Sequence, residues 1–459
     1  MELITSFRQL LDPFQCAFTA PSFEIFVCLM TGWALSHRRR FVTEAIWSSG
    51  CTHRGHHSRY HRFFSKSAWK LDTMSWVLAR VVIHVLVPTG LVELAVDDTL
   101  CRKRGLTIYG TGMHHDPLIS SRAKPLTSWG HDWVVVTLII RNLPWAPTKA
   151  WSLPLMFCLY RNRQGLTKGQ KKSQRSGKGG KRAPRPANHR TRPELAVELL
   201  SLLASWFPRR HFMLTGDSAY GGQSVLSKLP PNVDLISHVH PKGALYKPAP
   251  PVVEGQKGRH PKKGKRLPAM PAWAADTSQP WETLAFDEFG LHATLQVKTR
   301  QALYYKAGGQ RLLTIVLVRD VQGKRPDQMF YCTRLSWSAR EILSCYARRW
   351  SIEVTFENAK QLLGFEDAAN RTPKAVERTA PMALILYTLI LVWFHQVGHR
   401  YLKFPDRPWY PQKEEPSFAD MLTALRRQSW TEHFSRVLPK SGLAKKYLTQ
   451  IIEFLSLAG

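Results

Sequence analysis

Four side chains between residues 346 and 360 have the chemistry of a site that handles phosphate groups. The stretch contains no Gly or Pro and mixes apolar and charged residues at helical spacing, which predicts a helix. At about 100° per residue, four of its polar groups fall within roughly 60° of one another on one face. They are a phenol, two cations and one carboxylate: Tyr346, Arg349, Lys360 and Glu353. An acid among groups that position anions suits an enzyme that handles phosphate with a metal ion.

Strands that end in acids are the second chemical feature. One apolar run of strand type ends in Asp97 and Asp98, and a later run ends in Asp217. Carboxylates at the end of a buried strand must be paired, solvated or bound to a metal. Ligands gather at the carboxyl ends of strands in α/β sheets. We therefore expect these acids and Glu353 to meet around metal ions.

The elements that must carry these acids alternate between strand and helix. The apolar runs predict a meander of three strands, a helix, two further strands and a long helix that begins near Ser336 and carries Glu353. This order predicts an α/β fold, with a mixed sheet flanked by helices. The predicted strands are 91–98, 132–140, 151–160, 211–217, 233–238 and 327–333, and the helix after the third strand is Pro193–Phe207.

Changes in composition divide the chain into five predicted parts. A mainly β insertion interrupts the catalytic core, with short β segments expected at 294–298, 303–306 and 312–319. Helical regions precede and follow the core, the second of them for dimerisation or DNA contact. The parts are a helical DNA-binding domain at 1–88, the core at 89–239, the insertion at 240–326, the second part of the core at 327–405, and the C-terminal helical region at 406–459.

The charge of the chain points to a polyanionic partner. Lys and Arg number 65 against 33 Asp and Glu, which gives a formal net charge of +32. Nucleic acid is the first candidate partner, and a membrane surface is the second. The segment 161–192 is dense in Lys and Arg and has no acid, which predicts a flexible basic loop that contacts phosphates. Residues 51–64 interleave cations, histidines and aromatic rings, either as a DNA-contacting surface or as a solvated one.

The cysteines and the apolar runs favour a cytoplasmic protein. Seven cysteines are scattered and never form Cys-x-x-Cys, which argues against a disulfide framework. The apolar run 381–395 is shorter than the ~18–20 residues of a membrane helix, so we expect a core helix beneath the helix that carries the acid. The N-terminus has no signal-peptide pattern. A zinc site is a weak alternative, because the spacing of its ligands matches no established pattern: Cys51, His53, His56 and His57.

These motifs resemble those of DDE transposases of bacterial insertion sequences. The resemblance rests on Val96–Thr99, on Thr215–Ser218 and on the pattern Tyr-x2-Arg-x3-Glu-x6-Lys within 346–360, and it extends over roughly residues 90–400. It implies a ribonuclease-H-like core of the cut-and-paste type, with a β insertion between the second Asp and the Glu.

The resemblance also implies roles for the acids. Asp98, Asp217 and Glu353 are expected to be catalytic and to hold two Mg²⁺ ions, for which Mn²⁺ can substitute. Asp98 is preferred to Asp97 because the family's first acid commonly precedes Thr directly, and only one of two neighbouring strand residues can face the site. Glu357, one helical turn beyond Glu353, is expected to be a dispensable surface acid.

Contacts with DNA are expected from two groups of side chains. The resemblance implies that Tyr346, Arg349 and Lys360 contact phosphates near the scissile bond. It also implies that a Trp of the insertion, for which Trp273 and Trp281 are the candidates, supports a flipped base. The basic loops supply the second group of expected DNA contacts: Arg102, Lys103, Lys171, Lys172 and Arg175.

The function implied by the resemblance is DNA transposition in the bacterial cytoplasm, at the nucleoid. Such an enzyme binds the terminal inverted repeats of its element, hydrolyses a strand at each end and joins the freed 3′-OH to target DNA, with or without a hairpin intermediate. Its expected partners are double-stranded DNA and a second copy of the chain on paired ends, with no membrane. Two other functions remain open: a DDE nuclease without strand transfer, and a domesticated DNA-binding protein without catalysis.

Overall fold

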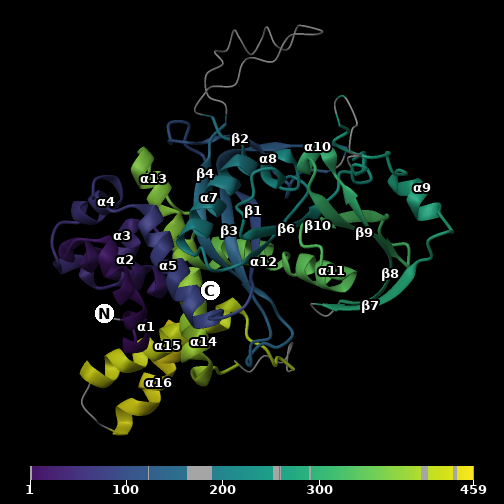
Figure 1. The fold of residues 1–459 in the computed structure, drawn as a ribbon. Helices are drawn as coiled ribbons and strands as arrows, with labels where there is room; N and C mark the ends of the chain where they lie inside the picture. Colours follow the sequence, from purple (N-terminus) through teal and green to yellow (C-terminus); the bar gives the residue numbers. More distant parts are fainter. Residues whose placement is uncertain are drawn as a thin grey trace.

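One mixed sheet passes through the whole molecule, with helices packed on both of its faces (Figure 1). The computed structural model describes residues 3–121, 123–162, 189–251, 258, 260–288, 291–404, 412–437 and 442–457. The described residues form ten strands: β1 (Val92–Arg102), β2 (Gly112–His115), β3 (Thr127–Ile140), β4 (Trp151–Tyr160), β5 (Phe212–Gly216), β6 (Val233–His238), β7 (Glu282–Glu288), β8 (Leu291–Leu303), β9 (Leu312–Asp320) and β10 (Gln328–Cys332).

The centre of the sheet has the mixed pairing of a ribonuclease-H-like fold. β1, β3 and β4 form the predicted antiparallel meander, and β1 also pairs in parallel with β5, which pairs in parallel with β6. The long β-branched and apolar run in β3 is buried on both faces, as expected for a central strand. The predicted α/β class and mixed sheet are confirmed. The short β2, which pairs with the start of β3, was not predicted.

The register of the sheet brings the strand acids together. Val96 of β1 lies beside Gly216 of β5, so Asp217 continues next to the Asp97–Asp98 pair. Within β1, Asp97 is opposite Val135 and Asp98 is opposite Val134 of β3. Successive strand residues point to opposite faces, and the two aspartates therefore meet different helices.

The insertion extends this sheet and does not form a sheet of its own. β10 pairs with β6, and β9, β8 and β7 follow in order to the outer edge, on the side away from the terminal helices (Figure 1). The predicted breaks were wrong in detail. β8 is continuous from Leu291 to Leu303, and the expected β segment at 303–306 falls on the short helix α10 (Tyr305–Gly308). β7 and α9 (Met270–Ala275) were not predicted.

The helices of the two terminal regions were predicted correctly as helical. Capping and proline signals mark several starts, such as Thr191 and Glu194, which form a capping box before α7. The remaining helices are α1 (Thr5–Leu11), α2 (Ala20–Leu35), α3 (Val42–Ser48), α4 (Ser58–Ser65), α5 (Leu71–Leu86), α7 (Arg192–Trp206), α8 (Gln223–Leu226), α11 (Ala339–Arg348), α12 (Ser351–Leu363), α13 (Pro373–Thr379), α14 (Pro381–Gln396), α15 (Phe418–Val437) and α16 (Gly442–Ser456).

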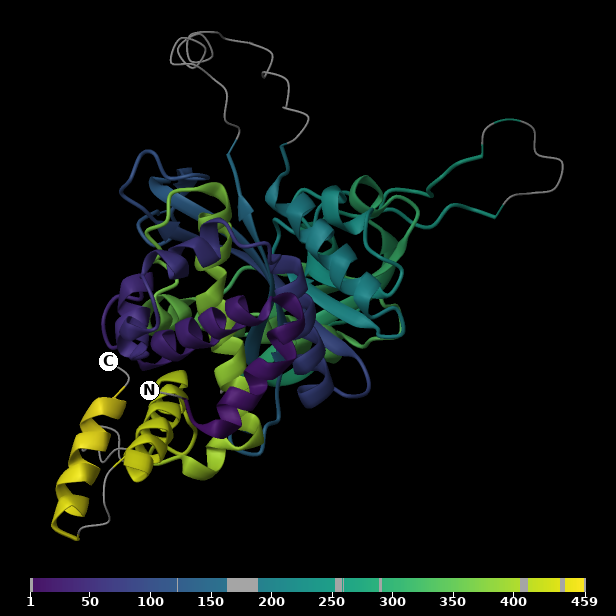
Figure 2. The same cartoon turned by 90° about the vertical axis from the view of Figure 1, so that its left-hand side faces the viewer.

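Helix α14 is the centre of the hydrophobic core. It contacts β4 and α12 on the catalytic side, α1, α2 and α5 of the N-terminal region, and α15 of the C-terminal region. Figure 2 shows the purple N-terminal helices beside yellow-green helices from late in the chain. In the described chain, 373–396 is the one helical stretch long and apolar enough to cross a membrane, but 94% of its most apolar window is buried in the protein. It is thus the core helix that was predicted.

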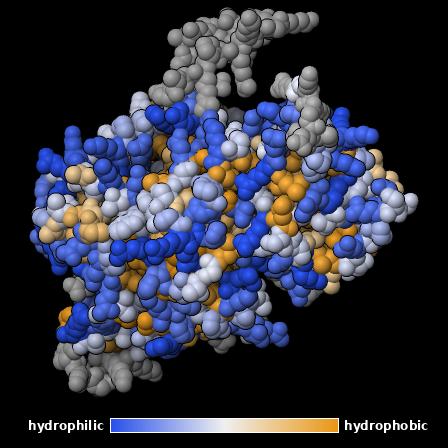
Figure 3. All heavy atoms as spheres, viewed as in Figure 1, coloured by the Kyte–Doolittle hydropathy of each residue, from blue (hydrophilic) through white to orange (hydrophobic). Residues whose placement is uncertain are grey.

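Hydrophilic side chains dominate the outer face shown in Figure 3.

Shortening a side chain of α14 is expected to destabilise all three regions together. Leu389 is fully buried, so Leu389→Ala should lower the free energy of unfolding by about 2–5 kcal/mol. Leu106→Ala, at a side chain that is 80% exposed, is the matched control and should change it by less than about 0.5 kcal/mol. Chemical denaturation followed by circular dichroism measures both. A separate early transition in the Leu389→Ala protein would show that the regions do not share one core.

Candidate active site

Asp217 is fixed at the carboxyl end of β5 by its own backbone. Its carbonyl accepts hydrogen bonds from the Ser237 hydroxyl at 2.7 Å and from the Tyr220 amide at 3.1 Å. One carboxylate oxygen accepts from the Ala219 amide at 2.9 Å, an Asx turn that ends the strand. The carboxylate is half-buried and keeps one oxygen free of hydrogen bonds within the described residues.

Asp97 and Asp98 point to opposite faces of β1. Asp97 Oδ2 accepts from Arg349 Nη1 at 2.6 Å, on the face covered by α11 and α12. Asp98 Oδ1 accepts from the Tyr220 hydroxyl at 2.8 Å, and its Oδ2 lies 3.2 Å from Arg192 Nε at the start of α7. Asp97, and not the predicted Asp98, therefore shares a face with the helix that carries Glu353.

The predicted single helix through 346–360 is two helices. α11 begins with a capping box of Ser338 and Glu341 and stops at Arg348, and α12 begins at Ser351. At the junction, the amides of Arg349 and Trp350 bond to the carbonyls three residues back, at 3.1 Å each, a tighter 3₁₀ turn. Tyr346, Arg349 and Glu353 of the predicted helix face still meet at this junction.

Glu353 lies in the first turn of α12, next to this junction. One of its carboxylate oxygens accepts from Arg349 Nη2 at 3.2 Å. Arg349 therefore bridges the acid of the helix and Asp97 of the strand, and its guanidinium also lies 5.8 Å from the Tyr346 ring centre. The three predicted groups Tyr346, Arg349 and Glu353 are together in the structure.

A buried ion pair holds α11 on the sheet. Arg348 is only 5% exposed and bonds both oxygens of Glu93, at 2.8 and 3.0 Å, and one oxygen of Glu288 at 3.2 Å. Glu93 and Asp97 are four residues apart on the same face of β1, so consecutive arginines of the helix end pair with consecutive acids of the strand. Glu288 belongs to β7, and the insertion is thereby tied to the active-site helix.

Burial makes the acids of this site weak. Loss of solvation raises the pKa of Asp97 to about 7 and that of Asp98 to about 6, and it also raises the pKa of Glu353. The negative charge of Asp217 adds to all three increases, while Arg349 and Arg192 oppose them. Negative charge is thus concentrated where a cation would be bound favourably.

The chemistry of these donors fits a hard divalent cation, which prefers carboxylate oxygens. Within the described residues, however, no three His, Cys, Asp or Glu side chains are close enough together to enclose an ion. The reason is visible in the contacts: Arg349 occupies the space between Asp97 and Glu353 and is bonded to both. The carboxylates suit a metal, but as they stand they are closed around an arginine.

The other predicted DNA-binding residues are mostly engaged within the protein. Lys360 donates to the Leu100 carbonyl at 2.8 Å. Lys103 donates to two backbone carbonyls, at 2.5 and 2.8 Å, and its burial lowers its pKa. Arg102 makes a bidentate pair with Asp116, at 2.7 and 3.0 Å. The predicted Lys171, Lys172 and Arg175 lie outside the described residues.

The two tryptophans proposed to support a flipped base are both covered. Trp273 is 1% exposed, with Arg300 at 3.6 Å from its ring centre. Trp281 is half-buried and has two cations on its ring, at 4.9 and 4.3 Å.

Glu357 is exposed, as predicted, and accepts from an amide of Gln361 at 3.1 Å instead of from a cation. The four side chains of the zinc alternative do not form a cluster that could hold a metal ion in the described part of the chain.

Sequence reasoning missed the groups that surround Asp98. Arg192 pairs with both Asp98 and the buried Asp132 of β3, and Tyr220 caps the other oxygen of Asp98. These contacts join residues far apart in the chain, so no local pattern indicates them. Trp350 was also passed over, although it adjoins Arg349 in the sequence and is 60% exposed.

The mixed sheet with acids at neighbouring strand ends and on a following helix defines a ribonuclease-H-like nuclease fold. The family model of the DDE superfamily endonucleases matches residues 13–307, and the chain belongs to this family. The match includes the Asp97–Asp98 pair and Asp217 and ends before Glu353. Comparison with curated proteins gave no match. Membership makes the protein an enzyme that acts on DNA, with the divalent-metal chemistry of that family.

The pH dependence of stability should report the burial of Asp97. Its pKa is raised from 3.8 to about 7 on folding, so the folded protein binds the proton more tightly, and the stabilisation is lost as pH rises towards 7. Without metal, the free energy of unfolding of the wild type minus that of Asp97→Asn should fall by about 1–3 kcal/mol between pH 5 and pH 8. Urea denaturation in EDTA measures it. A difference that rises with pH would mean that the Arg349 pair outweighs burial.

Proposed function

We propose that the protein is the transposase of a bacterial insertion sequence. It binds the terminal inverted repeats of its element, cuts the ends by metal-dependent hydrolysis and joins the 3′-OH to target DNA. The observation that carries the proposal is that Arg349 joins Asp97 to Glu353 beside Tyr346, with Asp217 near enough for its charge to raise the pKa of both acids. A family of DNA endonucleases and a net charge of +32 support it.

The acids of the proposed site would hold Mg²⁺, or Mn²⁺ in its place. Bound Mg²⁺ supplies activation of the attacking water and stabilisation of the leaving 3′ oxygen. Asp217 and Glu353 were predicted for this role, and the strand acid was predicted as Asp98. The contacts favour Asp97 for the third ligand, since it faces Glu353, whereas Asp98 is held by Tyr220 and Arg192 on the other face.

Arg349 would change partners when DNA binds. Its guanidinium now neutralises Asp97 and Glu353, and a phosphate is an equally good bidentate acceptor. Movement of Arg349 from the acids to the scissile phosphate would free both carboxylates and orient the DNA strand. Tyr346 lies under the same guanidinium and would keep it close to the site.

The terminal helical regions fit the proposed DNA and dimer contacts. Around α4, the side chains of Arg54, His57 and Arg59 are exposed and basic, which supports DNA contact by residues 1–88. On α16, Tyr447 and Phe454 are 65% and 75% exposed. Their spacing of seven residues places these rings on one helix face, which suits the proposed pairing of two copies on paired ends.

Substitution of the acids should abolish Mg²⁺-dependent cleavage. The substrate is a duplex that carries the element's ends. The variants Asp217→Ala, Glu353→Ala and Asp97→Ala are expected to lose at least about 10³-fold in cleavage rate, because metal ligands act as a unit. EDTA should stop the wild type. Glu357→Ala is the matched control, one turn away on the same helix and exposed, and should cut at the wild-type rate.

The outcome for the aspartate pair separates the two assignments. If Asp98→Ala is inactive and Asp97→Ala cuts normally, the metal acid is the one predicted from the family resemblance. Normal cutting by Asp217→Ala or Glu353→Ala would refute the proposed mechanism itself. Cleavage is measured on labelled DNA with rates taken at saturating enzyme, so that weak binding is not mistaken for lost chemistry.

Strand transfer distinguishes a transposase from a DDE nuclease. Precleaved ends with a free 3′-OH should be joined to a target plasmid by the wild type with Mg²⁺ and not by Glu353→Ala. Because two ends must be paired, the active complex should have the mass of two chains on two end duplexes, measured by light scattering. Efficient cutting without any joining would leave the nuclease as the function, and binding of DNA without cutting would indicate a domesticated DNA-binding protein.

A further inference from the structure

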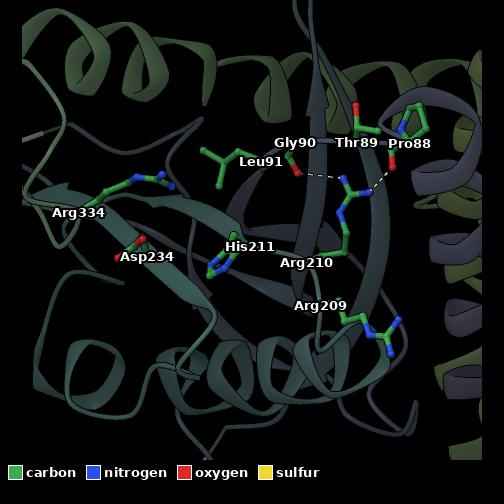
Figure 4. A pocket seen from close by; sticks show the side chains of 9 residues that line it. All are labelled: Pro88, Thr89, Gly90, Leu91, Arg209, Arg210, His211, Asp234 and Arg334. Atoms are coloured by element: carbon green, nitrogen blue, oxygen red, sulfur yellow. Dashed lines mark hydrogen bonds between the residues drawn. The ribbon is translucent and has the colours of Figure 1, made fainter.

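A basic cavity lies at the opposite end of the parallel strands from the acids. A cavity of about 570 Å³ opens where the parallel strands begin (Figure 4). Leu91 precedes β1, His211 precedes β5, and Asp234 is near the start of β6. From Leu91 to Asp97 the strand advances roughly 20 Å, at about 3.3 Å per residue. No single phosphate can therefore contact both the acids and this cavity.

Three arginines line the cavity, and the side chains of two of them have no hydrogen-bond or ion-pair partner among the described residues. The guanidinium groups of Arg209 and Arg334 have no hydrogen bond or ion pair to any described residue, and Arg334 only approaches the Trp337 ring, at 5.9 Å from its centre. Figure 4 shows Arg209 and Arg334 on opposite sides of the cavity, so each guanidinium is free to bind a separate phosphate group.

The third arginine builds the wall of the cavity. Arg210 donates to the carbonyls of Val87 and Pro88 at 2.7 Å each and to that of Gly90 at 3.1 Å, two of which are drawn in Figure 4. These bonds fix the loop between α5 and β1. The buried Nε of Arg210 has no hydrogen-bond acceptor within the described residues, so its donor capacity is not exhausted by the loop.

The one acid of the cavity is already compensated. Asp234 Oδ1 accepts from the Thr333 hydroxyl at 2.6 Å and lies 3.5 Å from Arg311. Asp234 is therefore paired with Arg311, which does not line the cavity. It forms no ion pair with Arg209 or Arg334 in the described structure. The lining remains positive, and His211 adds a further donor that is exposed to solvent.

We propose that this cavity binds the phosphate backbone of DNA, at a point separate from the strand held at the acids. The inference rests on the proposed DNA function and adds a second phosphate-binding site to it. The lining includes no Phe, Tyr or Trp ring on which a nucleobase could stack, and a free nucleotide is usually held by such a ring or by a glycine-rich loop. A backbone phosphate needs neither, and guanidinium groups suit its geometry.

The salt dependence of DNA binding tests the site. Each phosphate contact contributes about 0.9 to the slope of log K against log salt for duplex DNA. The double variant Arg209→Ala/Arg334→Ala should therefore reduce the slope by about 1.8 for a duplex of arbitrary sequence, measured by fluorescence anisotropy in EDTA. Arg209→Lys/Arg334→Lys keeps both charges and should keep the wild-type slope, which separates lost charge from lost folding.

A matched control removes two arginines whose charges are already paired. Arg8 bonds Asp12, and Arg436 bonds Glu432, so Arg8→Ala/Arg436→Ala changes the net charge equally and should leave the slope within about 0.5 of wild type, since no phosphate contact is lost. Equal slopes for this control and for Arg209→Ala/Arg334→Ala would overturn the inference.

Two further outcomes identify what has failed. If inorganic phosphate raises the thermal stability of the wild type but not of Arg209→Ala/Arg334→Ala, while the DNA slopes of the two are equal, the cavity takes free phosphate and the DNA assignment is overturned. If the wild type itself does not bind duplex DNA, the proposed function fails together with this site. If the wild type cuts DNA ends and Arg209→Ala/Arg334→Ala has the wild-type slope, only the second phosphate-binding site is refuted.

Discussion

Buried negative charge is the constraint on which the centre of this structure depends. Asp97 and Asp98 are half-buried close to Asp217, Glu353 is partly exposed, and the loss of solvation raises the pKa of all three. Two arginines, one from each side of the sheet, reduce the cost of this burial. Arg349 enters from the junction of α11 and α12, and Arg192 from the start of α7. These pairs connect the junction of α11 and α12 and the start of α7 to β1.

This compensation also sets the conditions for chemistry. Buried charges that lose a partner are strongly destabilising, so in the proposed mechanism another cation or a proton would have to neutralise Asp97 when Arg349 leaves it. In the proposed mechanism, a divalent ion would supply positive charge to the acids while a DNA phosphate would supply negative charge to the arginine. Substrate and metal would then depend on each other thermodynamically, which protects the free enzyme from holding an exposed set of metal ligands without DNA.

The sequence was sufficient for the fold class, the meander, the terminal helices and the neighbourhood of the acids, because hydrophobic period and strand-end polarity are local signals. It failed where long-range contacts decide. The break between α11 and α12 lies where Arg348 pairs with Glu93, a residue far away in the sequence, and the different faces of Asp97 and Asp98 appear only with their partners. The insertion looked separate because its Pro- and Lys-rich start hides the strands that extend the same sheet.

The position of α14 limits how proteins of this architecture can evolve. Helices from both ends of the chain cover one apolar helix of the catalytic core, so recombination that exchanged residues before β1 for an unrelated domain would leave that helix facing water. New specificity for DNA ends would have to arise by substitutions on outer faces, such as the exposed side of α4, while the inner faces stayed fixed. Although the protein has several regions, they would have to evolve together, because they share one hydrophobic core.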